Sequence, residues 1–335
     1  MVCCKPWTRC SVASESGPVR VAHVGCGAWG CNLVRELQAH PHVALELLID
    51  PDPSALDRAR VLAPQAIMAR SIDALRSTPV DAVVIATPGP LHAQHALAAL
   101  HAGADVFLEK PMTTSATDAR KLVATCRASE RIGVVGHLLH HHGAIRTLLN
   151  AVREGRIGVP HSFRSARLCV RGSRDVDGSL LWSLAPHDIS VLRALDPSHV
   201  RQMHVDLRCL GDSAPNVADL RLHLASGFEA HIVVSRAHRS KVRRMEVVGE
   251  LGTIGFDDVT SGPKLTLRWD GGVEELAFDR TQPLRTEVDA FVRCVRTRTP
   301  PRVGWSEGLE VVEILERAQS IATCGVADAV RIATG

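Results

Sequence analysis

The sequence has no tyrosine, and aromatic residues make up only 3% of its 335 positions. Without a phenol, the large group of enzymes that use tyrosine as proton donor is excluded. Lysine is also scarce, with five residues against 34 arginines, and the formal net charge is only +3. A charge so close to zero and so few aromatic side chains argue against nucleic acid as a partner.

Cysteine is present at ten positions, but no two cysteines have the CxxC spacing. A zinc knuckle or a thioredoxin-like redox site therefore has no support. No hydrophobic run approaches the ~18 residues of a membrane span, and the segment before Val19 lacks the apolar core of a secretory signal. We expect a reduced, cytoplasmic protein that binds no membrane.

The first half of the chain alternates short apolar runs with segments of helical spacing. After a polar stretch at residues 1–17, which predicts a flexible tail, strands are expected at residues 19–24, 45–50, 82–86, 105–108 and 132–135. Brief apolar runs of this kind are typical of strands buried on both faces of a parallel sheet. Residues 18–136 therefore predict a doubly wound α/β domain of the Rossmann type.

After Gly136 the pattern changes. A helix with Ile145, Leu148, Leu149 and Val152 on one face precedes a region rich in strand-like segments and turns. Strands are expected at residues 162–170, 203–210, 218–224, 229–235, 244–248 and 264–269, and helices near 286–298 and 306–324. Residues 137–330 therefore predict an α+β domain with a large, open, mostly antiparallel sheet.

A glycine-rich turn follows the first expected strand and opens a helix, with the sequence Gly25-Cys26-Gly27-Ala28-Trp29-Gly30. Gly25 permits a tight turn, Gly27 lets the backbone approach a pyrophosphate, and Gly30 allows the helix to pack on the strand. The amide groups at the helix N-terminus would face the phosphate charge. This context predicts dinucleotide binding by Gly25, Gly27, Ala28, Trp29 and Gly30.

Asp50 ends the second expected strand, twenty residues past Gly30. A carboxylate at this position can accept hydrogen bonds from both ribose hydroxyls and would repel a 2′-phosphate. NAD is therefore favoured over NADP as the cofactor. Arg58 and Arg60 follow soon after, and we expect them on the next helix as solvated charges.

Further motifs extend over the chain. They are Ala86-Thr87-Pro88, Leu91-His92, residues 103–111 ending in Glu109-Lys110-Pro111, Gly136-His137-Leu138-Leu139, residues 184–189, Val247-Val248-Gly249 and residues 308–312. Together with the glycine motif, they resemble the Gfo/Idh/MocA oxidoreductases, the family of glucose–fructose oxidoreductase and inositol 2-dehydrogenase. The resemblance covers about residues 18–325. The sequences of the motifs at residues 136–139 and 182–189 resemble the nucleotide-sugar 3-dehydrogenase branch of the family more than the inositol branch.

The resemblance implies hydride transfer between a nicotinamide and a secondary hydroxyl or ketone of a sugar or nucleotide-activated sugar. Lys110 and His187 would be catalytic, with Lys110 beside both the nicotinamide and the substrate hydroxyl. Thr87, Pro88, His92 and Glu109 would line the cofactor cleft. A homodimer or homotetramer is implied as well, in bacterial natural-product or polysaccharide biosynthesis.

One position departs from the family pattern. Four residues before the histidine, where the family often has aspartate, this chain has Ser183. Serine cannot take up a proton at neutral pH, and Asp188 points in a different direction on a helix, so we expect Asp188 to be structural. Three possibilities follow. Lys110 and His187 suffice for proton transfer, or the substrate or another residue supplies the negative charge of the missing carboxylate, or the site is altered or impaired.

Two clusters allow more than one interpretation. His137, His140, His141 and His142 could hold a metal, but no carboxylate or cysteine set accompanies them, so we expect no metal. His137 and His141, with Ser183 and His187, are instead expected to contact the substrate. Arg164, near Arg167, Arg171 and Arg174, is also expected to contact the substrate, where it would suit an anionic group. The alternative is a solvated face, and the same choice holds for the basic run at residues 236–244.

Three alternatives to a sugar dehydrogenase remain. Two are enzymes, a ketosugar reductase and a cyclitol dehydrogenase of the inositol type. The third is an NAD(H)-binding regulator or scaffold without turnover, and Ser183 is the residue that favours it.

Overall fold

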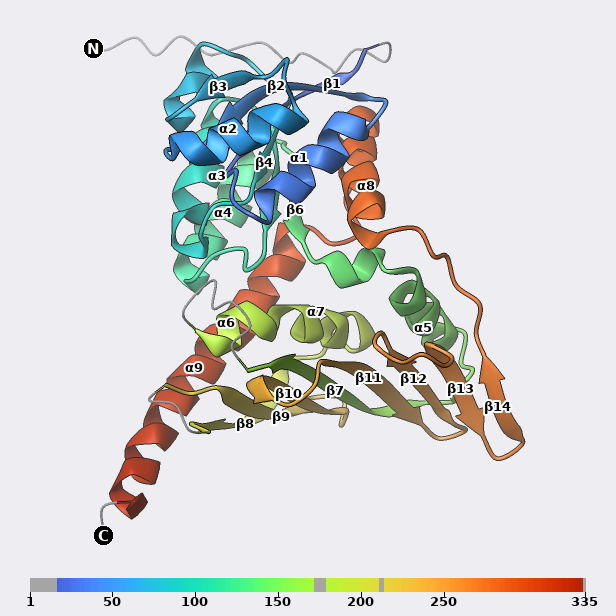
Figure 1. Ribbon diagram of the computed structural model, residues 1–335. Helices are drawn as coiled ribbons and strands as arrows, with labels where there is room; N and C mark the ends of the chain where they lie inside the picture. Colours follow the sequence, from blue (N-terminus) through green and yellow to red (C-terminus); the bar gives the residue numbers. More distant parts are fainter. Residues whose placement is uncertain (1–16, 172–178, 211–213, 334–335) are drawn as a thin grey trace.

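Two β-sheets, one above the other in Figure 1, form the framework of the computed structural model. The structure describes residues 17–171, 179–210 and 214–333. The tail expected at residues 1–17 lies almost wholly outside these ranges. The sequence also suggests a glycine-bounded turn at residues 172–178, and this segment lies wholly outside them. Within them, no helix is long and apolar enough to cross a membrane.

The first sheet is parallel, with the strand order β3-β2-β1-β4-β5-β6. Its strands are β1 (Val19–Val24), β2 (Val43–Ile49), β3 (Ile67–Ala69), β4 (Ala82–Ile85), β5 (Asp105–Glu109) and β6 (Gly133–Gly136). Between them run α1 (Gly30–Ala39), α2 (Pro53–Leu62), η1 (Ile72–Arg76), η2 (Gly89–Leu91), α3 (His92–His101) and α4 (Ala116–Ala128). β4, β5 and β6 are buried along their whole length, because their apolar side chains face helices on both sides. The Rossmann-type sheet is confirmed.

The second sheet has the order β14-β13-β12-β11-β7-β10-β9-β8 and is antiparallel except where β10 pairs with β7. Its strands are β7 (Pro160–Val170), β8 (Val200–Arg208), β9 (Val217–Leu224), β10 (Glu229–His238), β11 (Val242–Gly249), β12 (Thr253–Asp257), β13 (Leu265–Trp269) and β14 (Gly272–Glu275). η3 (Leu138–His141), α5 (Gly143–Arg153), α6 (Leu180–Leu184) and α7 (Pro186–Leu195) lie between this sheet and the first. The opposite face carries no helix in the described ranges, so the open, mostly antiparallel sheet is confirmed (Figure 1).

The last two helices connect the two layers. α8 (Pro283–Thr297) lies against α1 and the first sheet, where Phe291 packs edge-on against Phe107 of β5 with 5.7 Å between ring centres. α9 (Trp305–Ala333) begins beside β6 and α4 and continues along α7 to β8. The domain boundary expected at Gly136 remains a prediction. With that boundary α8 belongs to the second domain, yet it packs on the sheet of the first domain.

Truncating the Phe291 side chain tests whether α8 packs on the first sheet. Phe291 is 1% exposed, so Phe291→Ala should lower the free energy of unfolding by about 3–5 kcal/mol through lost burial and a cavity. Urea unfolding followed by circular dichroism measures the change. Val273→Ala on β14, where the side chain is 65% exposed, is the control and should shift stability by less than about 0.5 kcal/mol. Equal effects of the two substitutions would contradict the packing.

Candidate active site

The glycine loop after β1 is tight at both ends and open in the middle. Gly25 has a φ of +97°, and a Cβ there would lie 2.6 Å from the carbonyl oxygen of Ala86. At Gly30 a Cβ would lie 1.8 Å from the carbonyl oxygen of Gly25, whereas at Gly27 it would meet nothing within 4 Å. The loop therefore leaves space beside Gly27 and Ala28, at the N-terminal end of α1. This space fits the pyrophosphate of a dinucleotide.

Asp50 follows β2 and is fixed against the glycine loop. Its Oδ2 accepts a hydrogen bond of 2.7 Å from the Cys26 amide, and its Oδ1 accepts one of 2.9 Å from the Asp52 amide. Each oxygen keeps a second lone pair, and the side chain is half-buried. The carboxylate is therefore held beside the loop with acceptors to spare for ribose hydroxyls.

Glu109 connects the glycine loop to Lys110. Its Oε1 accepts a 2.5 Å hydrogen bond from the Trp29 indole, and its Oε2 accepts one of 3.1 Å from the Lys110 amide. Burial nevertheless raises the pKa of Glu109. Glu287 of α8 is also buried, its carboxyl oxygens have no hydrogen-bond partner in the described part of the chain, and burial with the nearby Glu109 raises its pKa well above the ordinary value. Glu287 was not predicted from the sequence, because nothing there distinguishes it from a solvated glutamate on an amphipathic helix.

Thr87, Pro88 and His92 lie where the chain leaves β4. The buried His92 ring places Nδ1 2.7 Å from the Pro111 carbonyl oxygen and Nε2 2.7 Å from that of Thr87. His92 thus joins the segment after β4 to the segment after β5. Thr87 Oγ1 lies 3.2 Å from Nδ1 of His95, and Pro88 is exposed at the surface. His92 therefore orders the loops that follow these two strands.

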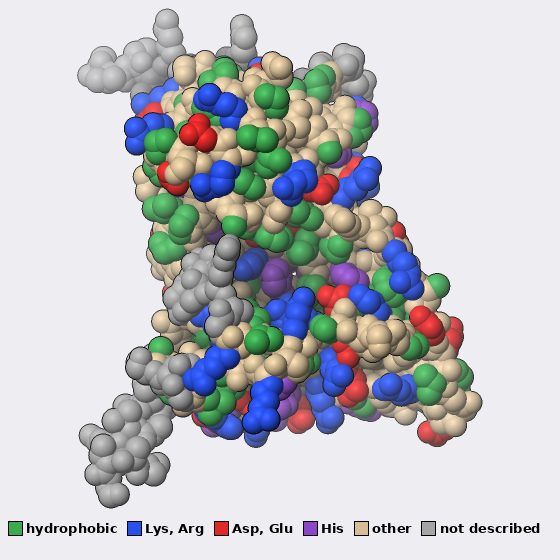
Figure 2. Space-filling view, viewed as in Figure 1, with side chains coloured by type: hydrophobic (Ala, Val, Ile, Leu, Met, Phe, Trp, Pro, Cys, Tyr) green, Lys and Arg blue, Asp and Glu red, His purple; other side chains and the backbone are tan. Residues whose placement is uncertain are grey.

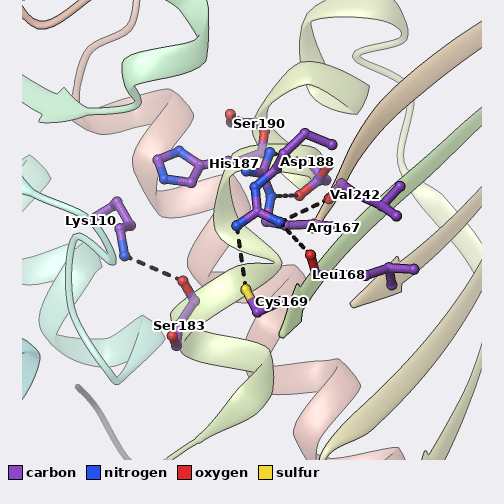
Figure 3. A network of polar contacts seen from close by, with 10 residues as sticks. Lys110, Arg167, Leu168, Cys169, Ser183, His187, Asp188, Ser190 and Val242 are labelled. Carbon is purple, nitrogen blue, oxygen red and sulfur yellow. Dashed lines mark hydrogen bonds and ion pairs between the residues drawn. The ribbon is translucent and has the colours of Figure 1, made fainter. Parts of the chain in front are cut away.

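Lys110 spans the gap between the two layers. Its Nζ donates a hydrogen bond of 3.3 Å to the backbone carbonyl of Ser183 in α6, as Figure 3 shows. Ser183 thus contacts Lys110 through an atom that any residue would supply. His187, in the first turn of α7, lies on the side of that helix that faces Lys110 (Figure 3).

His187 favours its uncharged form. Burial, followed by the positive charges of Arg167 and Lys110, lowers the pKa of His187 well below its ordinary value. Its Nδ1 is buried without a hydrogen-bond partner among the described residues. An uncharged imidazole has one ring nitrogen that can accept a proton.

Asp188 forms an ion pair with Arg167 of the second sheet. Arg167 Nε donates a 2.6 Å hydrogen bond to Asp188 Oδ2, and its Nη2 lies 3.4 Å from Oδ1. Both side chains are largely buried, at 11% and 1% exposure. Asp188 is therefore a structural carboxylate that anchors α7 to β7, as its position next to His187 predicts.

Arg164 does not lie with this group. It precedes Arg167 by three positions on β7, so the pleat sends it to the opposite face of the sheet. There its side chain is 66% exposed, with Nη1 4.0 Å from Glu246 Oε1. Arg167, which shares a face with the buried Phe163 and Ser165, takes the place in the cleft that was expected for Arg164.

The histidine cluster is uncharged and largely buried. Burial and neighbouring positive charges lower the pKa of His137 to about 3, of His140 to about 4 and of His141 to about 3. The His137 ring centre lies 6.3 Å from that of His140 and 6.4 Å from that of His187. Across the described ranges, no three histidine, cysteine or acidic side chains converge in a way that could hold a metal ion. His137 lies beside His187, but neither His137 nor His141 is among the residues that line the cleft, so their contact with a substrate stays a prediction.

These elements enclose a cleft of about 300 Å³ between the two layers. Figure 2 shows this face hollowed at mid-height, with histidine, lysine and arginine side chains in the hollow. The lining residues are Leu138, Leu139, His142, Ala166, Arg167, His187, Asp188, Arg243, Arg244, Met245, Phe256, Asp258 and Pro283. His187 is therefore part of the cleft wall, whereas Lys110 and the glycine loop are not among the residues that line it.

Comparisons with known proteins agree with this arrangement. Residues 19–137 match the oxidoreductase family with an NAD-binding Rossmann fold, and residues 145–255 match the Gfo/Idh/MocA C-terminal domain. The chain is 26% identical to a UDP-N-acetylglucosamine 3-dehydrogenase of Acidithiobacillus ferrooxidans, over 83% of this chain and 90% of that protein. It is 26% identical to an inositol 2-dehydrogenase of Rhodococcus erythropolis, over 85% and 86% of the two chains.

A solved structure of the Acidithiobacillus ferrooxidans UDP-N-acetylglucosamine 3-dehydrogenase has a similar fold. It superposes with a TM-score of 0.84 at 21% identity. The match covers 92% of this chain and 98% of that one. Both sheets are therefore part of the shared fold.

The buried histidines predict a pH-dependent stability. Between the ordinary pKa of 6.5 and the folded value of about 3, the unfolded chain binds a proton at His137 that the folded chain does not. His137 thus makes the free energy of unfolding fall as the pH is lowered, by about 1.4 kcal/mol per pH unit. His137→Leu should remove this contribution from the slope measured by urea unfolding between about pH 4 and pH 6.

Leu139→Ala is the control for the loss of packing alone. It removes no titratable group and should lower stability equally at each pH. If His137→Leu leaves the slope as steep as in the wild type, burial of an uncharged His137 is contradicted.

Proposed function

The chain belongs to the Gfo/Idh/MocA family of oxidoreductases, and we propose that it transfers a hydride between NAD and a secondary hydroxyl or ketone of a sugar or nucleotide-activated sugar. The observation that carries this proposal is that Lys110, which follows β5 of the first sheet, donates a hydrogen bond to the Ser183 carbonyl four residues before His187, and that its charge helps to lower the pKa of His187. Two relatives support the substrate class, because their names specify a nucleotide sugar and a cyclitol. A cyclitol dehydrogenase and a ketosugar reductase use the same chemistry, so a substrate panel separates them.

The residues around the glycine loop suit a dinucleotide. The open space beside Gly27 would take the pyrophosphate, and Asp50 would accept from the ribose hydroxyls. Asp50 would also repel a 2′-phosphate, which favours NAD. A bound nicotinamide supplies the site that takes up or releases the hydride.

The protein's own residues handle the proton. In the direction of oxidation, the uncharged His187 accepts the proton of the substrate hydroxyl. The Lys110 ammonium, fixed by the Ser183 carbonyl, donates a hydrogen bond to the oxygen as negative charge develops on it. The low pKa of His187 makes it a weak base while it accepts the proton, and it makes the protonated ring release that proton readily afterwards.

Ser183 is the residue that favours a second candidate function, in which the protein binds NAD(H) without catalysing a reaction. Its side chain cannot replace a carboxylate, and Asp188 is engaged by Arg167. Of the three possibilities open from the sequence, we propose that Lys110 and His187 suffice. We further propose that the protein is a cytoplasmic homo-oligomer, with the bare face of the second sheet as the surface for self-association.

Substitution of the two central residues tests the proposal. Lys110→Met and His187→Gln should each lower kcat by about 10²- to 10⁴-fold, because each removes a group that acts on the reacting oxygen. NADH absorbance is followed with sugars, cyclitols and nucleotide sugars, and with the matching ketones in reverse. Lys121→Met, an exposed lysine on α4, is the matched control and should retain full activity. NADH binding without turnover in either direction would favour the second candidate.

The cofactor preference depends on Asp50. We expect NADH to bind at least about 10-fold more tightly than NADPH, and Asp50→Ala to reduce that ratio by about 10-fold through loss of ribose hydrogen bonds and of repulsion. Fluorescence titration of each nucleotide measures the ratio. Asp57→Ala, an exposed aspartate on α2, should leave it unchanged. A wild-type preference for NADPH would overturn this interpretation of Asp50.

A further inference from the structure

Arg243 of β11 lies in the cleft opposite Arg167 of β7. The two residues are direct partners in the antiparallel register of these strands, so their side chains leave the same face of the sheet. Both side chains line the cleft, and His187 lines it as well. The second sheet therefore presents two neighbouring guanidinium groups to the place where a substrate would lie.

The two guanidinium groups differ in charge balance. Arg167 is neutralised by Asp188. Arg243 donates 3.0 and 2.9 Å hydrogen bonds from Nη1 to the carbonyls of Leu168 and Val242, and its Nη2 lies 3.3 Å from the Cys169 sulfur. Among the residues that the structure describes, no carboxylate forms an ion pair with Arg243. The carbonyls orient the group without cancelling its charge.

The other charges of the cleft are already matched. Asp258 pairs with Lys264 at 3.1 Å and lies 3.9 Å from His142, and Arg244 pairs with Asp257 at 2.6 Å. Arg243 is thus the cleft-lining arginine of the described chain that keeps an unmatched positive charge. A half-buried guanidinium of this kind is suited to an oxyanion, with which it can form charge-assisted hydrogen bonds.

We propose that Arg243 binds an oxyanion carried by the substrate, a carboxylate of a sugar acid or a phosphate of an activated sugar. Arg243 is the register partner of Arg167, which pairs with Asp188 next to His187, and all four residues line the same cleft, so we assign the anion to the molecule that reacts there. The substrates are therefore acidic rather than neutral. This inference rests on the proposed dehydrogenase activity for its place in the reaction, and it names the substrate class.

The experiment compares matched substrates on the full-length protein with NAD: glucuronate against glucose, glucose 6-phosphate against glucose, and UDP-glucose against methyl glucoside. The wild type should prefer the acidic member of at least one pair by about 10-fold or more in kcat/KM. Arg243→Gln should reduce that preference by about 10- to 100-fold, mainly through KM. The pair that responds identifies a carboxylate or a phosphate as the anion.

Two further variants control for folding and for charge. Arg243→Lys keeps the charge without the fork and should recover part of the preference. Arg76→Gln, on η1 far from this sheet, 86% exposed and paired with Asp73, should leave the preference unchanged. Thermal unfolding of each variant shows that the fold is retained.

The possible failures are distinguishable. Turnover of neutral and acidic sugars with equal kcat/KM in the wild type and in Arg243→Gln would overturn the inference while leaving the dehydrogenase proposal intact. If no sugar is turned over, calorimetric titration with glucuronate and glucose 6-phosphate still tests the site. Binding that is lost in Arg243→Gln would then support the anion site and refute the activity, and equal or absent binding would refute both.

Discussion

Helices from the far end of the chain fix the two sheets relative to one another, and the contact between Lys110 and Ser183 depends on that packing. The Trp305 ring, at the start of α9, leaves no room for a side chain at Gly133 and donates a 3.1 Å hydrogen bond to the Val134 carbonyl. α8 places Phe291 against β5, the strand that leads into Lys110. The distance across the cleft is thus set by residues that touch neither cofactor nor substrate.

The electrostatics of the cleft follow from burial more than from composition. Histidines gathered beside Lys110 lose their charge, because burial and nearby cations both penalise the protonated form. The pKa values of Glu109 and Glu287 are raised, because burial penalises the ionised form of a carboxyl group. In a chain without tyrosine, we propose that Lys110 and the uncharged His187 handle the proton. Pairing cancels most of the remaining cleft charges, and Arg243 is the exception among the described residues.

The sequence predicted the parallel sheet and its glycine loop because both depend on local patterns, short buried strands and the spacing of Gly25, Gly27 and Gly30. It missed β3 and β14 because they are short edge strands, and β12 because Gly255 interrupts its apolar pattern. The pairing of Arg243 with Arg167 depends on a register between distant strands, so no local pattern reveals it. For the same reason the sequence favoured Arg164, three positions away on the same strand, for the cleft.

The central claim is direct hydride transfer at the carbon whose hydroxyl meets Lys110 and His187. It is tested most directly with a sugar or nucleotide sugar deuterated at the carbinol carbon, incubated with NAD and the protein, with the nicotinamide product analysed by mass spectrometry and NMR. Transfer of one deuterium to C4 of the nicotinamide ring is the predicted result. Formation of the ketone with the deuterium released to water, or a reduced cofactor that carries no label, would contradict it.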